Sequence, residues 1–140
     1  MEPIGLKLKI AWKNNENAVN ALERLSNRAG ILLVATGVLI GLVISHVDPA
    51  PTLKNILYSL IVLLPPIIAY FLAFLVCFNL EIPFFSADDE EDLLKQVNQI
   101  NSKLAPILME RRRYFKGALL AFTISLGMCA SYLLHALWQI

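Results

Sequence analysis

The sequence predicts an all-α integral membrane protein with three transmembrane helices, cytoplasmic helical extensions and a short N-terminal strand. Of its 140 residues, 57% are hydrophobic and 16% charged, a more apolar balance than soluble domains show. Three runs contain no charged side chain, at residues 29–47, 56–80 and 117–140. Each is long enough for a helix that rises about 1.5 Å per residue to cross a hydrocarbon core of about 30 Å.

The positions of lysine and arginine predict the orientation. Five precede the first run and six lie between the second and third, against one between the first and second. By the positive-inside rule, the N-terminus and the long loop are cytoplasmic and the C-terminus external, as expected in a bacterial inner membrane. The residues expected to contact lipid at the inner surface are Lys7, Lys9, Lys13, Arg111, Arg112 and Arg113.

We expect a single membrane domain. Its parts are a cytoplasmic segment at 1–28, a first span at 29–47, a second span at 55–80, a cytoplasmic helical loop at 86–116 and a third span at 117–138. A charged, amide-rich stretch precedes the first span and no small-residue cleavage pattern follows it. This span should therefore remain in the mature protein.

Residues 4–13, IGLKLKIAWK, alternate apolar with small or basic side chains. A period of two is typical of a strand, because a helix would scatter these residues around its circumference. A lone strand needs a partner, so the segment either lies on anionic lipid or pairs with another copy or another protein.

Two cytoplasmic helices should each carry one apolar stripe at steps of three and four residues. The first helix continues into the first span, and its stripe comprises Ala18, Leu22, Leu25, Ala29 and Leu32. The stripe of the second comprises Leu93, Val97, Ile100, Leu104 and Ile107. The stripes could bury each other within a protomer or between protomers, and the helical loop is also a candidate surface for a cytoplasmic protein partner.

The second cytoplasmic helix has a start signal and an internal proline. Ser86 is a suitable N-cap, and the acidic run at 88–92 favours helix initiation. This run lacks the spaced oxygen ligands and the turn glycine of a calcium loop. Pro106 should kink or break the helix before the third span.

Small residues recur at four-residue steps in two spans. They are Gly37, Gly41 and Ser45 in the first, and Gly127 and Ser131 in the third. Such faces let helix backbones approach closely in lipid, where water supplies no hydrophobic drive. They serve either packing within the protomer or formation of a homo-oligomer.

Pro65 and Pro66 interrupt the second span. Because proline has no N–H, the carbonyls of Ile61 and Val62 lose their helical donors. Hydrocarbon tolerates this only where protein or water supplies another donor. We expect a kink that either fits neighbouring helices together or acts as a hinge beside a pore.

Few residues suggest chemistry. His46 and His135 fall at similar expected depth, where they could hold a haem, but their nearness to water favours interfacial roles. Cys77 and Cys129 lie at different depths, so we expect free thiols. With no nucleophile, base and acid combination and no phosphate loop, we expect neither an enzyme nor a cofactor or metal site, and no nucleic-acid partner.

The layout resembles the small membrane effectors of bacterial nucleotide-triggered anti-phage systems, the SLATT-type group and its relatives. The likeness lies in NAVNALERLSNRAG leading into the first span, the proline-bearing second span, and MERRRYFKG leading into the third. It implies an inner-membrane effector that oligomerises and permeabilises the membrane. With three spans and no attached nucleotide sensor expected, the signal would arrive through a partner or on the cytoplasmic helices. The alternative is a structural anchor or accessory subunit of a larger membrane complex.

Overall fold

The computed structural model describes residues 3–46, 53–78 and 89–138. They form three helices, α1 (Ile4–Ser45), α2 (Leu53–Cys77) and α3 (Glu90–Trp138). Each of the three, within these described ranges, is long and apolar enough to cross a membrane. The all-α class is confirmed, and the three apolar helices indicate a multi-pass membrane protein.

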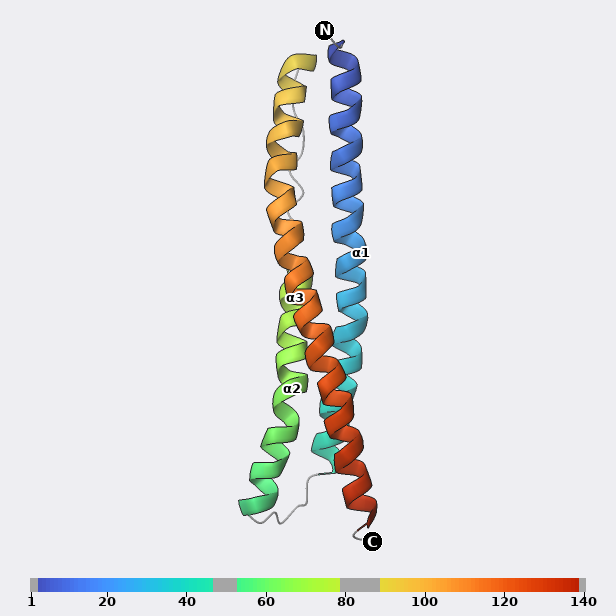
Figure 1. Ribbon diagram of the computed structural model, residues 1–140, viewed down its shortest axis with the longest axis vertical. Helices are drawn as coiled ribbons and strands as arrows, with labels where there is room; N and C mark the ends of the chain where they lie inside the picture. The colour runs from blue at the N-terminus through green and yellow to red at the C-terminus, as the bar shows by residue number, and fades with distance from the viewer. Residues whose placement is uncertain (1–2, 47–52, 79–88, 139–140) are drawn as a thin grey trace.

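The molecule is elongated, with α1 and α3 parallel and α2 antiparallel to both, so that the start of α1 and the end of α3 lie at opposite ends (Figure 1). α2 accompanies the other helices over only one half of this length. We call this half, residues 26–45, 53–77 and 111–132, the three-helix segment. The other half, in which residues 4–25 of α1 pair with residues 90–110 of α3, is the stalk.

Inward-facing residues repeat every seven positions along all three helices. Along α1 these are Asn15, Leu22, Ala29, Thr36 and Val43. Along α2 they are Val62, Ala69 and Val76, and along α3 they are Val97, Leu104, Arg111, Ala118 and Ser125. A seven-residue repeat keeps one stripe facing its partners when helices supercoil. The repeat in α1 and α3 runs from the stalk into the three-helix segment without a change of phase.

The core of the three-helix segment is made of small and branched side chains. One cluster joins Leu32, Ala73 and Ala118, and a second joins Val43, Val62 and Cys129. Each cluster takes one residue from each helix, so all three helices meet along the segment. The expected apolar stripes of the two stalk helices also pack within the protomer, where Leu22, Val97 and Leu104 are buried.

The predicted N-terminal strand is wrong, because residues 4–13 are the first turns of α1. Ala11 is buried, and the Nδ2 of Asn101 on α3 donates a hydrogen bond to its carbonyl, 2.9 Å away. The stripe of Ala11 and Asn15 thus continues the seven-residue repeat of the helix. Packing against α3 outweighs the local alternation, and side chains such as Leu6 and Ile10 are left exposed as a result.

Pro106 does not break the second stalk helix, since α3 is continuous through it. Pro106 is exposed, so its missing N–H falls on the outer side of the helix. There, water can replace the lost hydrogen bond. The expected loop helix and the third span are therefore parts of one 49-residue helix. The expected N-cap, Ser86, lies outside the described residues.

Candidate functional site

The small residues of the first span lie on the outside of the protomer. Gly37, Gly41 and Ser45 are all exposed. A Cβ placed on Gly37 or Gly41 would meet no atom within 4 Å. The Oγ of Ser45 donates to the carbonyl of Leu42, 2.8 Å away, so this hydroxyl is satisfied within α1. We call these three residues the α1 small-residue face.

A second, shorter face of the same kind lies on α3. Gly127 and Ser131 are exposed, and a Cβ on Gly127 would also meet no atom within 4 Å. The Oγ of Ser131 donates to the carbonyl of Gly127 at 2.9 Å. By contrast, a Cβ on Gly117 would lie 3.2 Å from Cδ1 of Leu72. Gly117 therefore serves packing of α2 on α3, whereas the two small-residue faces are open.

The prolines occupy the middle of α2, which stays helical through both of them. Pro66 is fully buried and Pro65 partly buried. The prolines deprive the carbonyls of Ile61 and Val62 of their helical donors. Val62 is buried and faces the other helices, whereas Ile61 is exposed. The proline turn is therefore packed against α1 and α3 on one side.

The buried hydroxyls of the three-helix segment do not line a polar channel. Thr36, Ser59 and Ser125 each donate to the carbonyl four residues earlier on their own helix, at distances of 2.6 to 2.9 Å. Their neighbours on the inward faces are mostly apolar. Among the described residues, the interior of a single protomer is thus largely apolar.

Arg111 joins two helices where the stalk meets the three-helix segment. Its Nη1 donates to the carbonyl of Val76 and its Nη2 to that of Phe78, each at 2.8 Å. Only 8% of the residue is exposed. The last carbonyls of a helix lack intrahelical partners and carry the negative end of its dipole. A buried guanidinium is therefore well placed at the end of α2.

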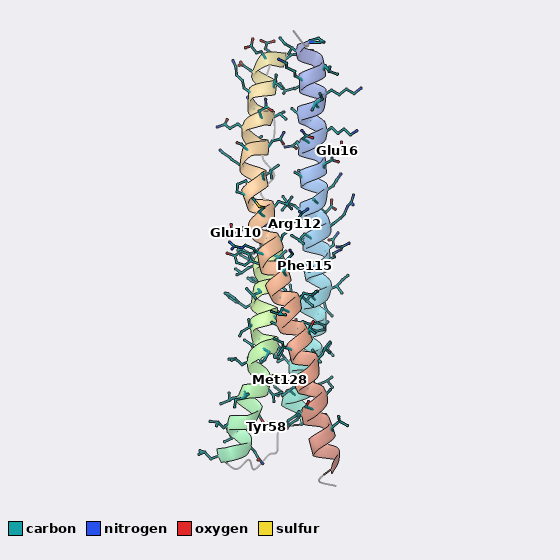
Figure 2. The ribbon with its side chains drawn as sticks, in the orientation of Figure 1. Glu16, Tyr58, Glu110, Arg112, Phe115 and Met128 are labelled. Carbon is teal, nitrogen blue, oxygen red and sulfur yellow. The ribbon has the colours of Figure 1, made fainter. Side chains whose placement is uncertain are left out.

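Sequence reasoning missed this role by assigning Arg111 to the lipid surface with its two neighbours. Arg112 and Arg113 are indeed exposed, and Arg112 lies at this junction, at the level of Glu110 (Figure 2). The signal that distinguishes Arg111 is its spacing. It falls seven residues after Leu104 and seven before Ala118, on the inward stripe of α3.

The N-terminal lysines lie far from the junction. Lys13 and Lys7 precede Ser26, which contacts the end of α2, by 13 and 19 residues. At about 1.5 Å per residue these distances are roughly 20 and 29 Å along the helix. The expected inner-surface lipid contact of Lys7, Lys9 and Lys13 stays a prediction, because no contact in the described part of the chain tests it.

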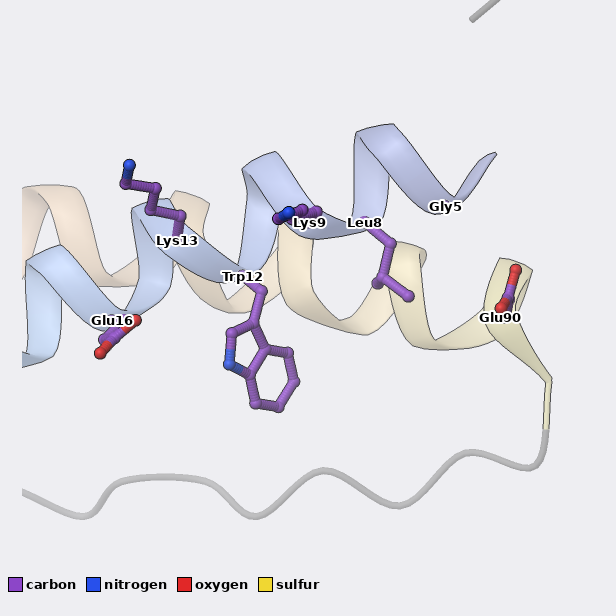
Figure 3. A pocket seen from close by; sticks show the side chains of 7 residues that line it. All are labelled: Gly5, Leu8, Lys9, Trp12, Lys13, Glu16 and Glu90. Carbon is purple, nitrogen blue, oxygen red and sulfur yellow. The ribbon is translucent and has the colours of Figure 1, made fainter. Parts of the chain in front are cut away.

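The stalk helices are linked by a pair of asparagines. The Nδ2 of Asn15 donates to the Oδ1 of Asn101 at 3.1 Å, and Asn101 in turn donates to the carbonyl of Ala11. At the free end of the stalk, Leu8 and Trp12 of α1 line a hollow that extends to Glu90 of α3 (Figure 3).

The opposite end of the three-helix segment carries His46 and two tyrosines. Tyr132 donates to the carbonyl of His46 at 3.2 Å and stacks on Tyr58, with 5.8 Å between ring centroids. The Nδ1 of His46 lies 2.8 Å from the carbonyl of Leu42 on its own helix. The side chain of His135 lies outside the described residues, so its expected proximity to His46 stays a prediction.

Comparison with known protein families, curated proteins and solved structures finds no match for this chain.

Proposed function

We propose that this protein is a small inner-membrane effector that self-associates and, once assembled, permeabilises the bilayer. The observation that carries the proposal is the open surface at Gly37, Gly41 and Gly127, where an added Cβ would meet no atom within 4 Å. Contacts between small residues are a main source of packing energy for helices in lipid. Two such faces that serve no contact within the protomer are available to neighbouring copies.

The dimensions of the three-helix segment support its placement in the bilayer. From Ser26 to Ser45, and from Arg111 to Tyr132, the helices rise about 29 to 32 Å. This matches a hydrocarbon core of about 30 Å. The surplus of lysine and arginine before the first span and between the second and third supports a cytoplasmic stalk. Triggering by a nucleotide signal, and a role in anti-phage defence, rest on the resemblance of layout alone.

The two small-residue faces differ and lie on different helices, which favours head-to-tail assembly. An interface that joins unlike surfaces forms a ring when the rotation closes. Because the buried residues of one protomer are largely apolar and line no polar channel, we propose that the leak opens between protomers or after α2 moves. Pro65 and Pro66 are the hinge in this proposal, since two lost backbone donors make α2 easiest to bend there.

The decisive experiment combines a mass measurement in mild detergent with an ion-leak assay in proteoliposomes. Gly41→Leu fills the α1 small-residue face and should give a smaller species with less leak. The matched control is Leu42→Phe, because residue 42 is 47% exposed and points about 100° away around the helix. It should leave both measurements unchanged. A parent protein that is monomeric in detergent and in lipid would refute the proposal.

A second candidate function is that of an anchor or accessory subunit. Ile4, Leu6, Ile10 and Trp12, at the free end of the stalk, are 45% to 50% exposed. Far from the bilayer, such apolar side chains are typical of a surface that another protein covers. A parent that forms no homo-oligomer, but purifies from its own cells with one partner in fixed ratio, would favour this function. Replacing Ile10 and Trp12 with serine should then release the partner.

A further inference from the structure

Three described contacts across the junction involve the end of α2. Two are the hydrogen bonds from Arg111, and the third joins the Sγ of Cys77 to the carbonyl of Ser26 at 3.6 Å. α1 and α3 cross the same level as continuous helices in one seven-residue repeat. Each of α1 and α3 is therefore expected to move as one body from the stalk into the three-helix segment. Among the described residues, α2 is linked to this movement by side-chain packing along its length and by the contacts at its end.

The geometry at Arg111 is suited to holding the end of α2. Its two terminal nitrogens reach carbonyls on either side of Cys77, so one planar group fixes both the position and the direction of the last turn. The positive charge lies at the negative end of the α2 dipole, and burial from water strengthens this attraction. The amide of Phe78 also continues the helix by donating to the carbonyl of Phe74 at 3.0 Å.

We propose that Arg111 is a positioning residue that couples the stalk to α2. When the stalk helices shift or rotate, the guanidinium carries the end of α2 with them. When the two hydrogen bonds from Arg111 break, the last turn of α2 can separate from α3 while the stalk helices stay paired. We call the two hydrogen bonds from Arg111 to the end of α2 the tether. A role of the tether in opening a leak rests on the proposed function, whereas the existence of the tether does not.

Cys77 offers a native reporter for the tether, because its thiol is partly buried at the held end of α2. In a Cys129→Ala background, the rate of maleimide labelling at Cys77 reports how often this end opens. Loss of one charge-assisted hydrogen bond changes such an opening equilibrium by about tenfold or more. Arg111→Ala should therefore raise the labelling rate by at least about tenfold.

Two further variants separate the effect of the two-armed hydrogen bonding by Arg111 from the effects of its positive charge and of side-chain removal in general. Arg111→Lys keeps the charge, but its ammonium cannot reproduce the planar two-armed geometry, so its labelling rate should be intermediate. Arg112→Ala removes the neighbouring exposed arginine and should label at the parent rate. Labelling of Arg111→Lys at the parent rate, or of Arg111→Ala at the parent rate, would overturn the proposal.

Hydrogen exchange of stalk amides separates release of α2 from general unfolding. In Arg111→Ala, the stalk around Val97 should stay as protected as in the parent while the last turn of α2 loses protection. Equal loss in both regions would overturn the proposal by making Arg111 a general stabiliser. A parent that causes no leak would refute the proposed function, yet the labelling and exchange results would still decide whether the tether exists.

Discussion

Replacing the asparagines of the stalk should reveal a strong energetic coupling between α1 and α3. Asn101→Leu removes both hydrogen bonds described above, one with Asn15 and one to the carbonyl of Ala11. It leaves the amide of Asn15, a residue only 9% exposed, without this partner. An unsatisfied buried polar group costs about 1–3 kcal/mol, so we expect a loss of that size in the stability of the stalk.

The reverse substitution should cost less. Asn15→Leu removes one hydrogen bond, while Asn101 keeps its bond to Ala11 and is only half-buried, within reach of water. We expect a loss of about 0.5–1.5 kcal/mol. The double substitution to leucine removes both amides and extends the apolar stripe, so its stability should be close to that of the parent. The cycle should therefore show a coupling of about 1 kcal/mol or more.

Native-state hydrogen exchange of stalk amides measures these free energies in the intact protein. Spin labels at the exposed positions Glu16 and Lys103 report the alignment of the helices. Their distance distribution should broaden in the double variant, because a buried asparagine fixes helix register at a cost in stability. The reasoning is refuted if the double variant loses as much stability as the two single variants together.

Three further predictions concern topology, the proline turn and the core. In a background without native cysteines, a thiol reagent that cannot cross the membrane should label His46→Cys in intact cells but not Glu91→Cys. The opposite labelling pattern would show that the protein has the reverse orientation. Replacing Pro65 and Pro66 with leucine should restore two backbone hydrogen bonds, leaving membrane levels normal but abolishing ion leak; normal leak would show that the prolines are not the hinge. Leu22→Ala should lower stalk stability by about 2–5 kcal/mol, measured by hydrogen exchange, whereas no change would mean that this fully buried side chain is not part of a tight core.

Local properties of the chain determined the helical class and the number of apolar helices. A charge-free run such as residues 56–80 can satisfy its backbone in hydrocarbon most simply as a helix. The recurrence of Ala18, Leu22 and Leu25 likewise indicated the inward face of the first stalk helix. These inferences depend on period and length, which a single segment carries without knowledge of its neighbours.

Residues 4–13 and Pro106 show where local patterns were insufficient. The alternation in IGLKLKIAWK is typical of a strand. However, Ala11 and Asn15 can both form hydrogen bonds with Asn101 of α3 only when the segment is helical. Pro106 was expected to kink or break its helix, yet it lies on the exposed side of α3, where water can replace the lost hydrogen bond. In both cases the partner helix decided the outcome, and it is distant in the sequence.

Which side of a helix is left uncovered was decided by tertiary structure alone. The same spacing of Gly37 and Gly41 fits packing inside a protomer or between protomers, and only the positions of α2 and α3 leave that side open. Arg111 resembled its neighbours Arg112 and Arg113 in sequence. It became the cap of α2 because the supercoil turns every seventh residue inward, and position 111 coincides with the level at which α2 ends.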